Sequence, residues 1–310
     1  MARILVTGAA GFIGTALCPV LAARGHQVVA GLRRAAPPGG VPSVALGDIG
    51  PATDWPAVLG GVEIVIHLAQ RAHAGPDPAT LAAEADAVAA LGRAAARAGA
   101  RRLMLLSSVK AMGEATAPGW PFRPDDAPLP ADAYGRAKLA SEQAAAAVAR
   151  ETGLELVVIR PPLVYGPGAR ANFAALLRLA ASGLPLPSAA LDNRRSLIFR
   201  DNLVDLIALA AVHPHATGKT LLVRDGDDLS TPRLIRALAA GLGRAARLFP
   251  VPNAAFAAAR RLPGVGPKLA RLTLSLQVDD AATRAVLGWT PPVSAAEGLA
   301  ATARAFAARR

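Results

Sequence analysis

Short apolar runs alternate with longer alanine-rich stretches through the first half of the chain. The runs occupy residues 4–6, 28–30, 44–46, 64–66, 103–106 and 156–159. They lack the alternation of apolar and polar positions that a half-exposed strand shows, which is typical of strands buried on both faces of a parallel sheet. The stretches between them at 12–24, 80–97 and 133–150 predict helices. This order predicts an α/β fold with a doubly wound parallel sheet of the Rossmann type.

The second half of the chain has a less regular pattern. Repeated prolines at 117–130 predict a long loop, and residues 160–168 also indicate a loop. Beyond them we expect a helix at 172–182, a strand at 197–199, a helix at 203–212, a strand at 220–223 and helices from 231 to 310. The pattern predicts a dinucleotide-binding domain at 1–165, to which 197–224 returns. Residues 166–196 and 225–310 would form a smaller C-terminal substrate-binding domain.

Composition narrows the class of protein. The chain has 310 residues, 53% of them hydrophobic and 18% charged, which indicates a large buried core. The net charge of +12 raises the question of nucleic acid or an anionic membrane. However, the arginines are scattered and aromatic residues make up only 4%, too few for a base-stacking surface, so we expect no nucleic-acid partner.

The N-terminal segment 4–23 carries no charge and has to be distinguished from a membrane span. It contains three glycines, two threonines and Pro19, which fit a strand, a turn and a buried helix better than a span, so we expect no membrane insertion. The single cysteine, Cys18, excludes a disulfide scaffold and is consistent with a cytoplasmic protein.

A glycine-rich turn follows the first predicted strand. Gly8, Gly11 and Gly14 are spaced three residues apart, and a helix begins directly after them. In such a turn the first glycine permits the tight bend, the second lets the backbone approach a pyrophosphate, and the third permits close packing of helix and sheet. The helix N-terminus attracts phosphate. This arrangement predicts a dinucleotide site.

The end of the second strand bears on which dinucleotide is bound. An acidic residue there usually holds the ribose hydroxyls of NAD, but this chain has Arg33 and Arg34, two guanidiniums that could hold a 2′-phosphate. We therefore expect NADP, with NAD as the alternative. Asp48, at the end of the third strand, is a candidate contact for the adenine amino group.

A serine, a tyrosine and a lysine suit the transfer of hydride at an alcohol or ketone. Tyr134 and Lys138 are four residues apart and share one helix face after the candidate N-cap Asp132. Ser107 and Ser108 end the fifth strand, and a serine at this edge would face the nicotinamide, so both are candidates. A tyrosine base needs a lowered pKa at neutral pH, and we expect the Lys138 ammonium and the cationic nicotinamide ring to lower it.

The motifs TGAAGFIG at 7–14, HLA at 67–69, SS at 107–108, YGRAK at 134–138 and RPPLVYGPG at 160–168 together resemble the extended short-chain dehydrogenase/reductases of the NAD-dependent epimerase/dehydratase family. The resemblance implies that Tyr134 is the acid/base, Lys138 its ribose-binding partner and Ser108 the residue that binds the substrate oxygen. It also implies cofactor contacts in or near these motifs, namely Phe12, Ile13, Ile49, Leu68, Ala69 and Pro161. The chain departs from the family pattern at Glu84, where an asparagine is common, and at Lys110 and Met112, where many sugar epimerases have threonine and tyrosine.

The same resemblance implies a nucleotide-diphosphate sugar as substrate, and we expect a UDP-sugar of polysaccharide biosynthesis. Asn172 and Arg195 match the diphosphate contacts of sugar-nucleotide epimerases, and Arg271 is a further candidate. Arg71 and His73 are candidates for the sugar pocket. The histidines lack carboxylate or cysteine companions at ligand spacing, so no metal site is expected.

Four functions are consistent with these residues. The leading hypothesis is an NAD(P)-dependent oxidoreductase that reduces a 4-keto sugar, with Tyr134 as proton donor. The alternative is a UDP-sugar 4-epimerase. A sugar-nucleotide dehydratase is a weaker hypothesis, because such enzymes have acidic residues beside the catalytic serine or threonine and Ser108 has none. A non-catalytic dinucleotide sensor is also weaker, because such proteins typically lose the catalytic tyrosine or lysine and both Tyr134 and Lys138 are present. The resemblance also implies a homodimer through a helix bundle that would include residues 80–97 and 133–150.

Overall fold

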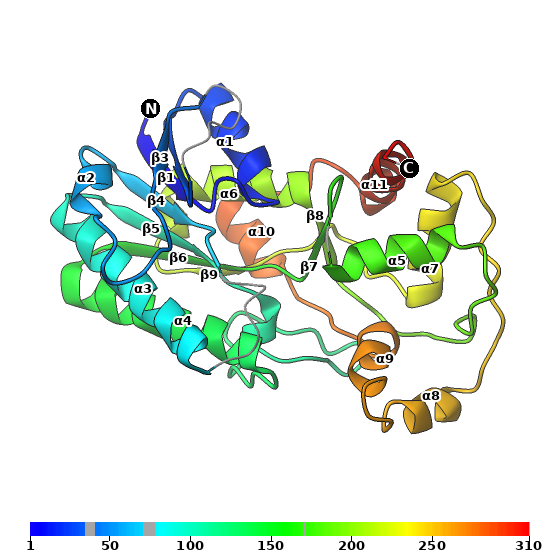
Figure 1. The fold of residues 1–310 in the computed structure, drawn as a ribbon. Coiled ribbons are helices and arrows are strands. Elements are labelled where there is room, and N and C mark those ends of the chain that lie inside the picture. Colours follow the sequence, from blue (N-terminus) through cyan, green and yellow to red (C-terminus); the bar gives the residue numbers. More distant parts are fainter. Residues whose placement is uncertain (35–40, 71–77, 170, 310) are drawn as a thin grey trace.

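A seven-stranded parallel sheet is the centre of the computed structural model, which describes residues 1–34, 41–70, 78–169 and 171–309, without the side chains of 78–81, 171, 172, 267 and 268. The sheet order is β3-β2-β1-β4-β5-β6-β9 (Figure 1). Its strands are β1 (Arg3–Thr7), β2 (Gln27–Leu32), β3 (Ser43–Ala45), β4 (Ile64–His67), β5 (Arg102–Leu106), β6 (Glu155–Arg160) and β9 (Thr220–Leu222). The strand order reverses between β1 and β4, which opens a ligand crevice at the carboxyl ends of these strands. The predicted Rossmann-type fold is confirmed.

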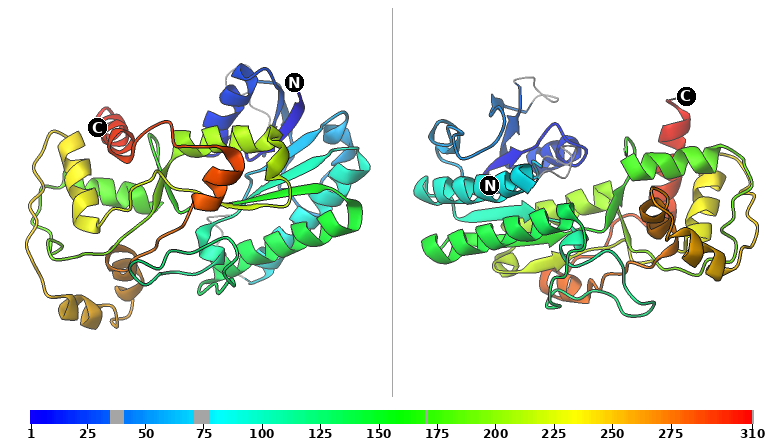
Figure 2. Two further views of the ribbon diagram at one scale, coloured as in Figure 1. Left: turned by 180° about the vertical axis from the view of Figure 1, so that it is seen from behind. Right: turned by 60° about the horizontal axis from the view of Figure 1, so that its bottom comes forward.

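Helices cover both faces of this sheet, as the unbroken apolar runs of its strands require. Neighbouring residues of β1 alternate between two separate cores: Ile4 and Val6 pack on one side and Leu5 on the other. The first face is covered by α1 (Gly14–Ala23), α6 (Arg200–Val212) and α10 (Ala281–Leu287). The second is covered by α2 (Pro56–Leu59), α3 (Pro78–Arg97) and α4 (Ala133–Thr152). Figure 2 shows α3 and α4 side by side along this second face.

A smaller region with its own core lies beyond the carboxyl ends of the strands (Figures 1 and 2). It contains α5 (Ala171–Ala181), α7 (Thr231–Gly241), α8 (Asn253–Ala259), α9 (Gly266–Thr273) and α11 (Ala295–Ala307). Two short strands, β7 (Leu163–Tyr165) and β8 (Leu197–Phe199), pair in parallel and join it to the main sheet region. Two single-turn helices complete the described elements, η1 (Val109–Ala111) and η2 (Pro214–Ala216).

One predicted loop is wrong in part. Residues 163–165 form β7, whereas the prolines and glycines of 160–168 indicate only a loop. The strand exists because its partner β8 lies more than thirty residues away, a pairing that no local pattern reveals. The buried Tyr165 hydroxyl donates to Asp225 Oδ2 at 2.7 Å, which ties this small sheet to the turn after β9. Segment 197–224 therefore supplies β8 to the small sheet and β9 to the main one.

Among the helices that the structure describes, none has both the length and the apolar character needed to cross a bilayer. The same described residues contain no group of three or more His, Cys, Asp or Glu side chains that could hold a metal ion.

Candidate active site

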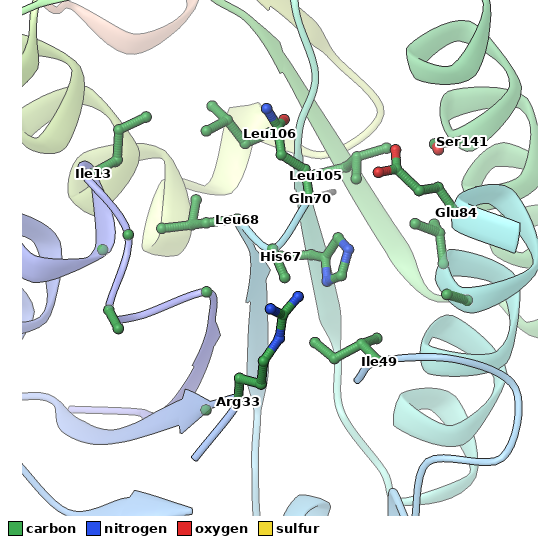
Figure 3. Close-up of a pocket in the computed structure, with 18 of the residues that line it drawn as sticks. Ile13, Arg33, Ile49, His67, Leu68, Gln70, Glu84, Leu105, Leu106 and Ser141 are labelled. Atoms are coloured by element: carbon green, nitrogen blue, oxygen red, sulfur yellow. The ribbon is translucent and has the colours of Figure 1, made fainter. Parts of the chain in front are cut away.

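A cavity of about 550 Å³ opens at the carboxyl ends of the strands, where the strand order reverses (Figure 3). The glycine turn after β1 forms one wall, and the ends of β2, β4 and β5 form the floor. Helices α3 and α4 close the far side. Most residues predicted to bind the cofactor line this cavity, namely Gly8, Gly11, Phe12, Ile13, Gly14, Arg33, Asp48, Ile49, Leu68, Ala69 and Lys138.

The glycine turn has a backbone shape that only glycine permits. Gly8 has a φ of 71°, and a Cβ there would lie 2.7 Å from the backbone nitrogen of Ala69. A Cβ at Gly14 would lie 2.5 Å from the Gly8 carbonyl oxygen, so α1 starts in direct contact with the turn. Gly11 is exposed and faces the cavity. A bare backbone beside a helix N-terminus suits a pyrophosphate, so the site fits a dinucleotide.

An ion pair occupies the outer rim of the cavity, which we define as the ends of β2 and β3. The Arg33 Nε lies 2.9 Å from Asp48 Oδ1, and both side chains are 69% exposed. The guanidinium predicted to bind a 2′-phosphate is therefore paired with the carboxylate predicted to bind adenine. Arg34 follows the end of β2, is exposed and does not line the cavity, so its contact with a cofactor stays a prediction.

The predicted catalytic residues meet at the inner end of the cavity, which we define as the ends of β4 and β5 with the first turns of α4. The Tyr134 hydroxyl lies 3.4 Å from Gln70 Oε1 and 3.4 Å from Gln70 Nε2. Ser108 is close enough to lower the pKa of Tyr134. The Ser108 oxygen accepts a hydrogen bond from the Lys110 amide at 3.2 Å, so its hydroxyl proton can point toward a substrate oxygen. Asp132 caps α4 by accepting from the Gly135 amide, as the sequence predicts.

Tyr134 itself does not line the cavity, and neither does Pro161. The tyrosine lies just past the lining residues, on the side of the loops after β4 and β5. The Pro161 carbonyl accepts a hydrogen bond from Val109 at 3.0 Å and so joins the end of β6 to η1. The cofactor contacts of Tyr134 and Pro161 stay predictions.

Lys138 lies at the bottom of the inner end and is only 4% exposed. Its ammonium donates to the Leu106 carbonyl at 3.3 Å and lies 5.9 Å from the centre of the Tyr134 ring. Burial lowers the pKa of Lys138 to about 8, against the opposing charges of Glu84 and Glu142. The lysine is therefore cationic at neutral pH and titrates in a range where pH can control it.

The pKa of Tyr134 differs from the expectation. Burial raises it above the ordinary value, and the charges of Glu84 and Asp132 raise it further, while hydrogen bonds with Gln70 and Ser108 oppose this. The protein groups alone do not produce the lowered pKa that the sequence predicts, because burial and the two carboxylates outweigh the hydrogen bonds.

Ser107, the fallback for Ser108, has another role. Its hydroxyl donates to Glu142, and that carboxylate also receives Arg160 through two nitrogens, Nη2 at 2.6 Å from Oε2 and Nε at 3.0 Å from Oε1. All three residues are buried. The group joins β5, α4 and β6 directly under the catalytic residues, and Ser107 is not available to a substrate.

His67 packs at the end of β4, as expected from its position. Its Nδ1 shares a 2.8 Å hydrogen bond with the Thr7 hydroxyl. Burial, together with the nearby Lys138 charge, lowers its pKa to about 3, so the ring is neutral under ordinary conditions. The uncharged His67 ring therefore adds no second positive charge beside Lys138 at the inner end.

The predicted substrate residues are only partly placed. The half-buried Arg195 donates from Nη1 to the Leu274 carbonyl at 3.0 Å. Burial lowers its pKa, with Glu114 opposing this and Arg271 adding to it, so these two arginines lie within electrostatic reach of each other. Arg71 and His73 fall outside the described residues, as does the side chain of Asn172, whose backbone lies in the first turn of α5.

Three residues of the site were not singled out by the sequence. Gln70 reaches Tyr134, Ser141 lines the cavity from α4, and Glu142 joins Ser107 to Arg160. Figure 3 shows Glu84 and Ser141 together on the helical side of the cavity. The only available signal was position: Gln70 follows the HLA motif, and Glu142 is one turn beyond Lys138 on the same helix face.

Comparison with known proteins places these features in a family. The model of the NAD dependent epimerase/dehydratase family matches residues 4–223. A UDP-glucose 4-epimerase of Vibrio cholerae is 39% identical over 311 residues, covering 98% of this chain and 95% of that protein. A 3-diazoavenalumate denitrifying reductase of a Streptomyces species is 35% identical and covers 93% of this chain and 96% of its own.

A solved structure, MoeE5 in complex with UDP-glucose and NAD, superposes with a TM-score of 0.78 at 27% identity and covers 99% of each chain. The family model spans the whole main sheet, from β1 to the end of β9, and includes the glycine turn, Ser108, Tyr134 and Lys138. The chain therefore belongs to the NAD dependent epimerase/dehydratase family of enzymes.

Proposed function

We propose that this protein is a UDP-sugar 4-epimerase that works with bound NAD, and that UDP-glucose and UDP-galactose are the first pair to test. The similarity to a named UDP-glucose 4-epimerase over nearly the whole chain supports the reaction class. The Arg33–Asp48 ion pair favours NAD over NADP as the cofactor, and with NAD it favours the epimerase over the reductase. A 2′-phosphate at this rim would have to displace the carboxylate or lie beside it, whereas the unphosphorylated ribose of NAD would not.

The residues of the inner end would divide the chemistry among them. NAD held at the glycine turn of Gly8, Gly11 and Gly14 would supply reversible hydride chemistry at C4 of the sugar. Tyr134 would accept the proton of the C4 hydroxyl through its phenolic oxygen and later give it back to the same oxygen. Ser108 would donate a hydrogen bond to that oxygen and hold it beside Tyr134.

Lys138 would supply positive charge close to Tyr134. The buried tyrosine has a raised pKa, so a phenolate needs compensation from a nearby cation. The ammonium of Lys138 is held by the Leu106 carbonyl and keeps its charge at neutral pH. Protonated Lys138 thus favours the form of Tyr134 that accepts a proton.

The diphosphate of the sugar nucleotide would bind at Arg195, with Asn172 and Arg271 as further contacts. Arg271 disfavours the charge of Arg195, so an anion between the two would relieve that repulsion. Arg71 and His73 remain predictions for the sugar pocket. A homodimer across α3 and α4 also remains a prediction, which size-exclusion chromatography with light scattering would test.

A 4-keto reductase using NADP is the second candidate, favoured by two arginines and no acidic residue at the end of β2. This function requires that Arg33 break its ion pair with Asp48 and bind the 2′-phosphate of NADP instead. The two functions differ in an observable way, because a reductase consumes its cofactor and an epimerase regenerates it.

The test uses purified protein with no added cofactor. UDP-glucose is supplied and UDP-galactose is followed by proton NMR, and the cofactor released on denaturation is identified by chromatography. The proposal expects conversion to an equilibrium mixture and the recovery of NAD. Absence of conversion, with NADPH consumed when a UDP-4-keto sugar is supplied, would overturn it in favour of the reductase.

A further inference from the structure

Lys110 makes contacts that the proposed reaction does not use. It lies in η1, directly after β5, with its side chain 23% exposed. Its ammonium lies 2.7 Å from Glu114 Oε1 and 2.6 Å from Asp132 Oδ2. One lysine thus joins two carboxylates that are well separated along the chain.

Asp132 is the more informative of these partners because it is the N-cap of α4. Its other oxygen, Oδ1, accepts from the Gly135 amide at 2.7 Å. Burial tends to raise the pKa of Asp132, but hydrogen bonds from Lys110 and Gly135 outweigh it and hold the pKa below its ordinary value. Both oxygens of an ionised cap are therefore engaged, one by the helix and one by Lys110.

The backbone of Lys110 contacts the same two catalytic elements. Its amide donates to the Ser108 hydroxyl oxygen at 3.2 Å. Its carbonyl faces α4 so closely that a Cβ on Gly135 would lie only 2.2 Å from the Lys110 oxygen. The loop that carries Ser108 and the helix turn that carries Tyr134 are therefore in direct contact at this residue.

We propose that Lys110 is a positioning residue, which locks the loop bearing Ser108 to the N-terminus of α4 and thereby fixes Ser108 and Tyr134 relative to each other. The proposal rests on the proposed function only for the identity of the substrate. The lysine stands at one of the positions where the sequence departs from the pattern of many sugar epimerases.

The ammonium also adjusts the charge around Tyr134. The groups that face this tyrosine come from several elements. They are Gln70 after β4, Ser108 after β5, Glu84 on α3, Asp132 before α4, and the Lys138 ammonium on α4 itself. Asp132 raises the pKa of Tyr134, and the Lys110 cation at 2.6 Å offsets that negative charge. Loss of the cation should therefore raise the pKa of Tyr134 further.

A kinetic experiment compares Lys110→Met, Lys110→Arg and the control Lys219→Met, in which an exposed lysine is changed. All are purified with their bound cofactor. For Lys110→Met we expect kcat to fall by about 10- to 100-fold, since a misplacement of roughly 1 Å has effects of this order. KM for UDP-glucose should stay within about threefold of the wild type. Lys110→Arg should restore most of the activity, and Lys219→Met should have no effect.

A second measurement does not depend on the substrate. The chain has only two tyrosines, and burial together with the Asp225 carboxylate raises the pKa of Tyr165 far above its ordinary value. Tyrosinate absorbance, corrected with Tyr134→Phe, therefore follows Tyr134 directly. Lys110→Met should titrate at higher pH than the wild type, and Lys110→Arg close to it. If Lys110→Met does not fold, Lys110→Gln replaces it.

The outcomes separate the two hypotheses. A protein that fails to convert UDP-glucose but shows the tyrosinate shift disproves the proposed substrate and supports the role of Lys110. Lys110→Met protein that loses thermal stability, yet titrates like the wild type and keeps its kcat, would show that Lys110 is merely structural. Equal impairment of Lys110→Arg and Lys110→Met would also contradict the proposal.

Discussion

The outer rim and the inner end of the cavity hold their charges in opposite ways. At the rim, Arg33 and Asp48 form a pair with both side chains largely exposed. At the inner end, Lys138 is buried, and the Glu142–Arg160 pair beneath it is 7% exposed on each side. Water screens the exposed pair and is largely excluded from the buried one. The interaction between opposite charges is therefore much weaker at the rim than at the inner end.

This difference in burial predicts that the rim affects the choice of cofactor, whereas the inner end determines activity and stability. An exposed pair contributes little to stability and can rearrange when a ligand arrives. When one residue of a buried ion pair is removed, water cannot take its place beside the charge that remains. We therefore expect substitutions at the inner end to abolish activity or stability, and those at the rim only to adjust the choice of cofactor.

The largest effect is expected at Tyr134. Phenylalanine keeps the ring and removes only the oxygen that exchanges the proton, so kcat should fall by about 10²- to 10⁴-fold. The bound cofactor should be retained, because the glycine turn is unchanged. Steady-state kinetics and quantification of the released cofactor test both points. Near-normal turnover by Tyr134→Phe would remove the catalytic assignment.

Breaking the buried pair should give the next largest effect. Glu142→Gln leaves the Arg160 guanidinium without a counter-charge, and we expect a loss of about 3–5 kcal/mol in the free energy of unfolding. Urea denaturation followed by circular dichroism measures it. The matched control is Glu151→Gln, on the same helix, whose partner Arg93 is exposed. The control should change stability far less, and similar losses in both variants would contradict the comparison.

The pH dependence of activity should reflect Lys138. Its pKa of about 8 is lower than that of an exposed lysine, so its charge is present below pH 8 and is lost as the pH rises through that value. The activity should decline over the same range. Glu84 raises the pKa of Lys138, so Glu84→Gln should move this decline to lower pH, by about one unit or less. His67 stays neutral throughout. A decline that does not move would show that Lys138 is not the titrating group.

The smallest effect is expected at the rim. Asp48→Asn removes the carboxylate from Arg33 and should improve NADP binding relative to NAD by a few-fold, about 1 kcal/mol at most. Fluorescence titration with both cofactors measures the ratio, with the exposed Asp54→Asn as the control. A ratio that is unchanged would mean that Arg33 does not face the ribose of the cofactor.

The sequence predicts the backbone-determined parts of the molecule well. The apolar runs locate the main strands, and Gly8 and Gly14 stand where a side chain would collide with the backbone. Arg33 shows the limit of such reasoning. Its position at the end of β2 is evident, but its pairing with Asp48 depends on how β2 and β3 end side by side. Lys110 and Glu142 likewise acquire their roles from partners that only the fold brings close.

The most direct test of the proposed epimerase follows the hydrogen on C4. UDP-glucose deuterated at C4 is incubated with the purified protein and unlabelled NADH in the medium, and the UDP-galactose formed is analysed by mass spectrometry. An epimerase that returns the same hydrogen within one closed site will keep the deuterium at C4. Product in which hydride from the added NADH has replaced the deuterium at C4, or conversion that requires NADPH, would contradict the proposed epimerase mechanism.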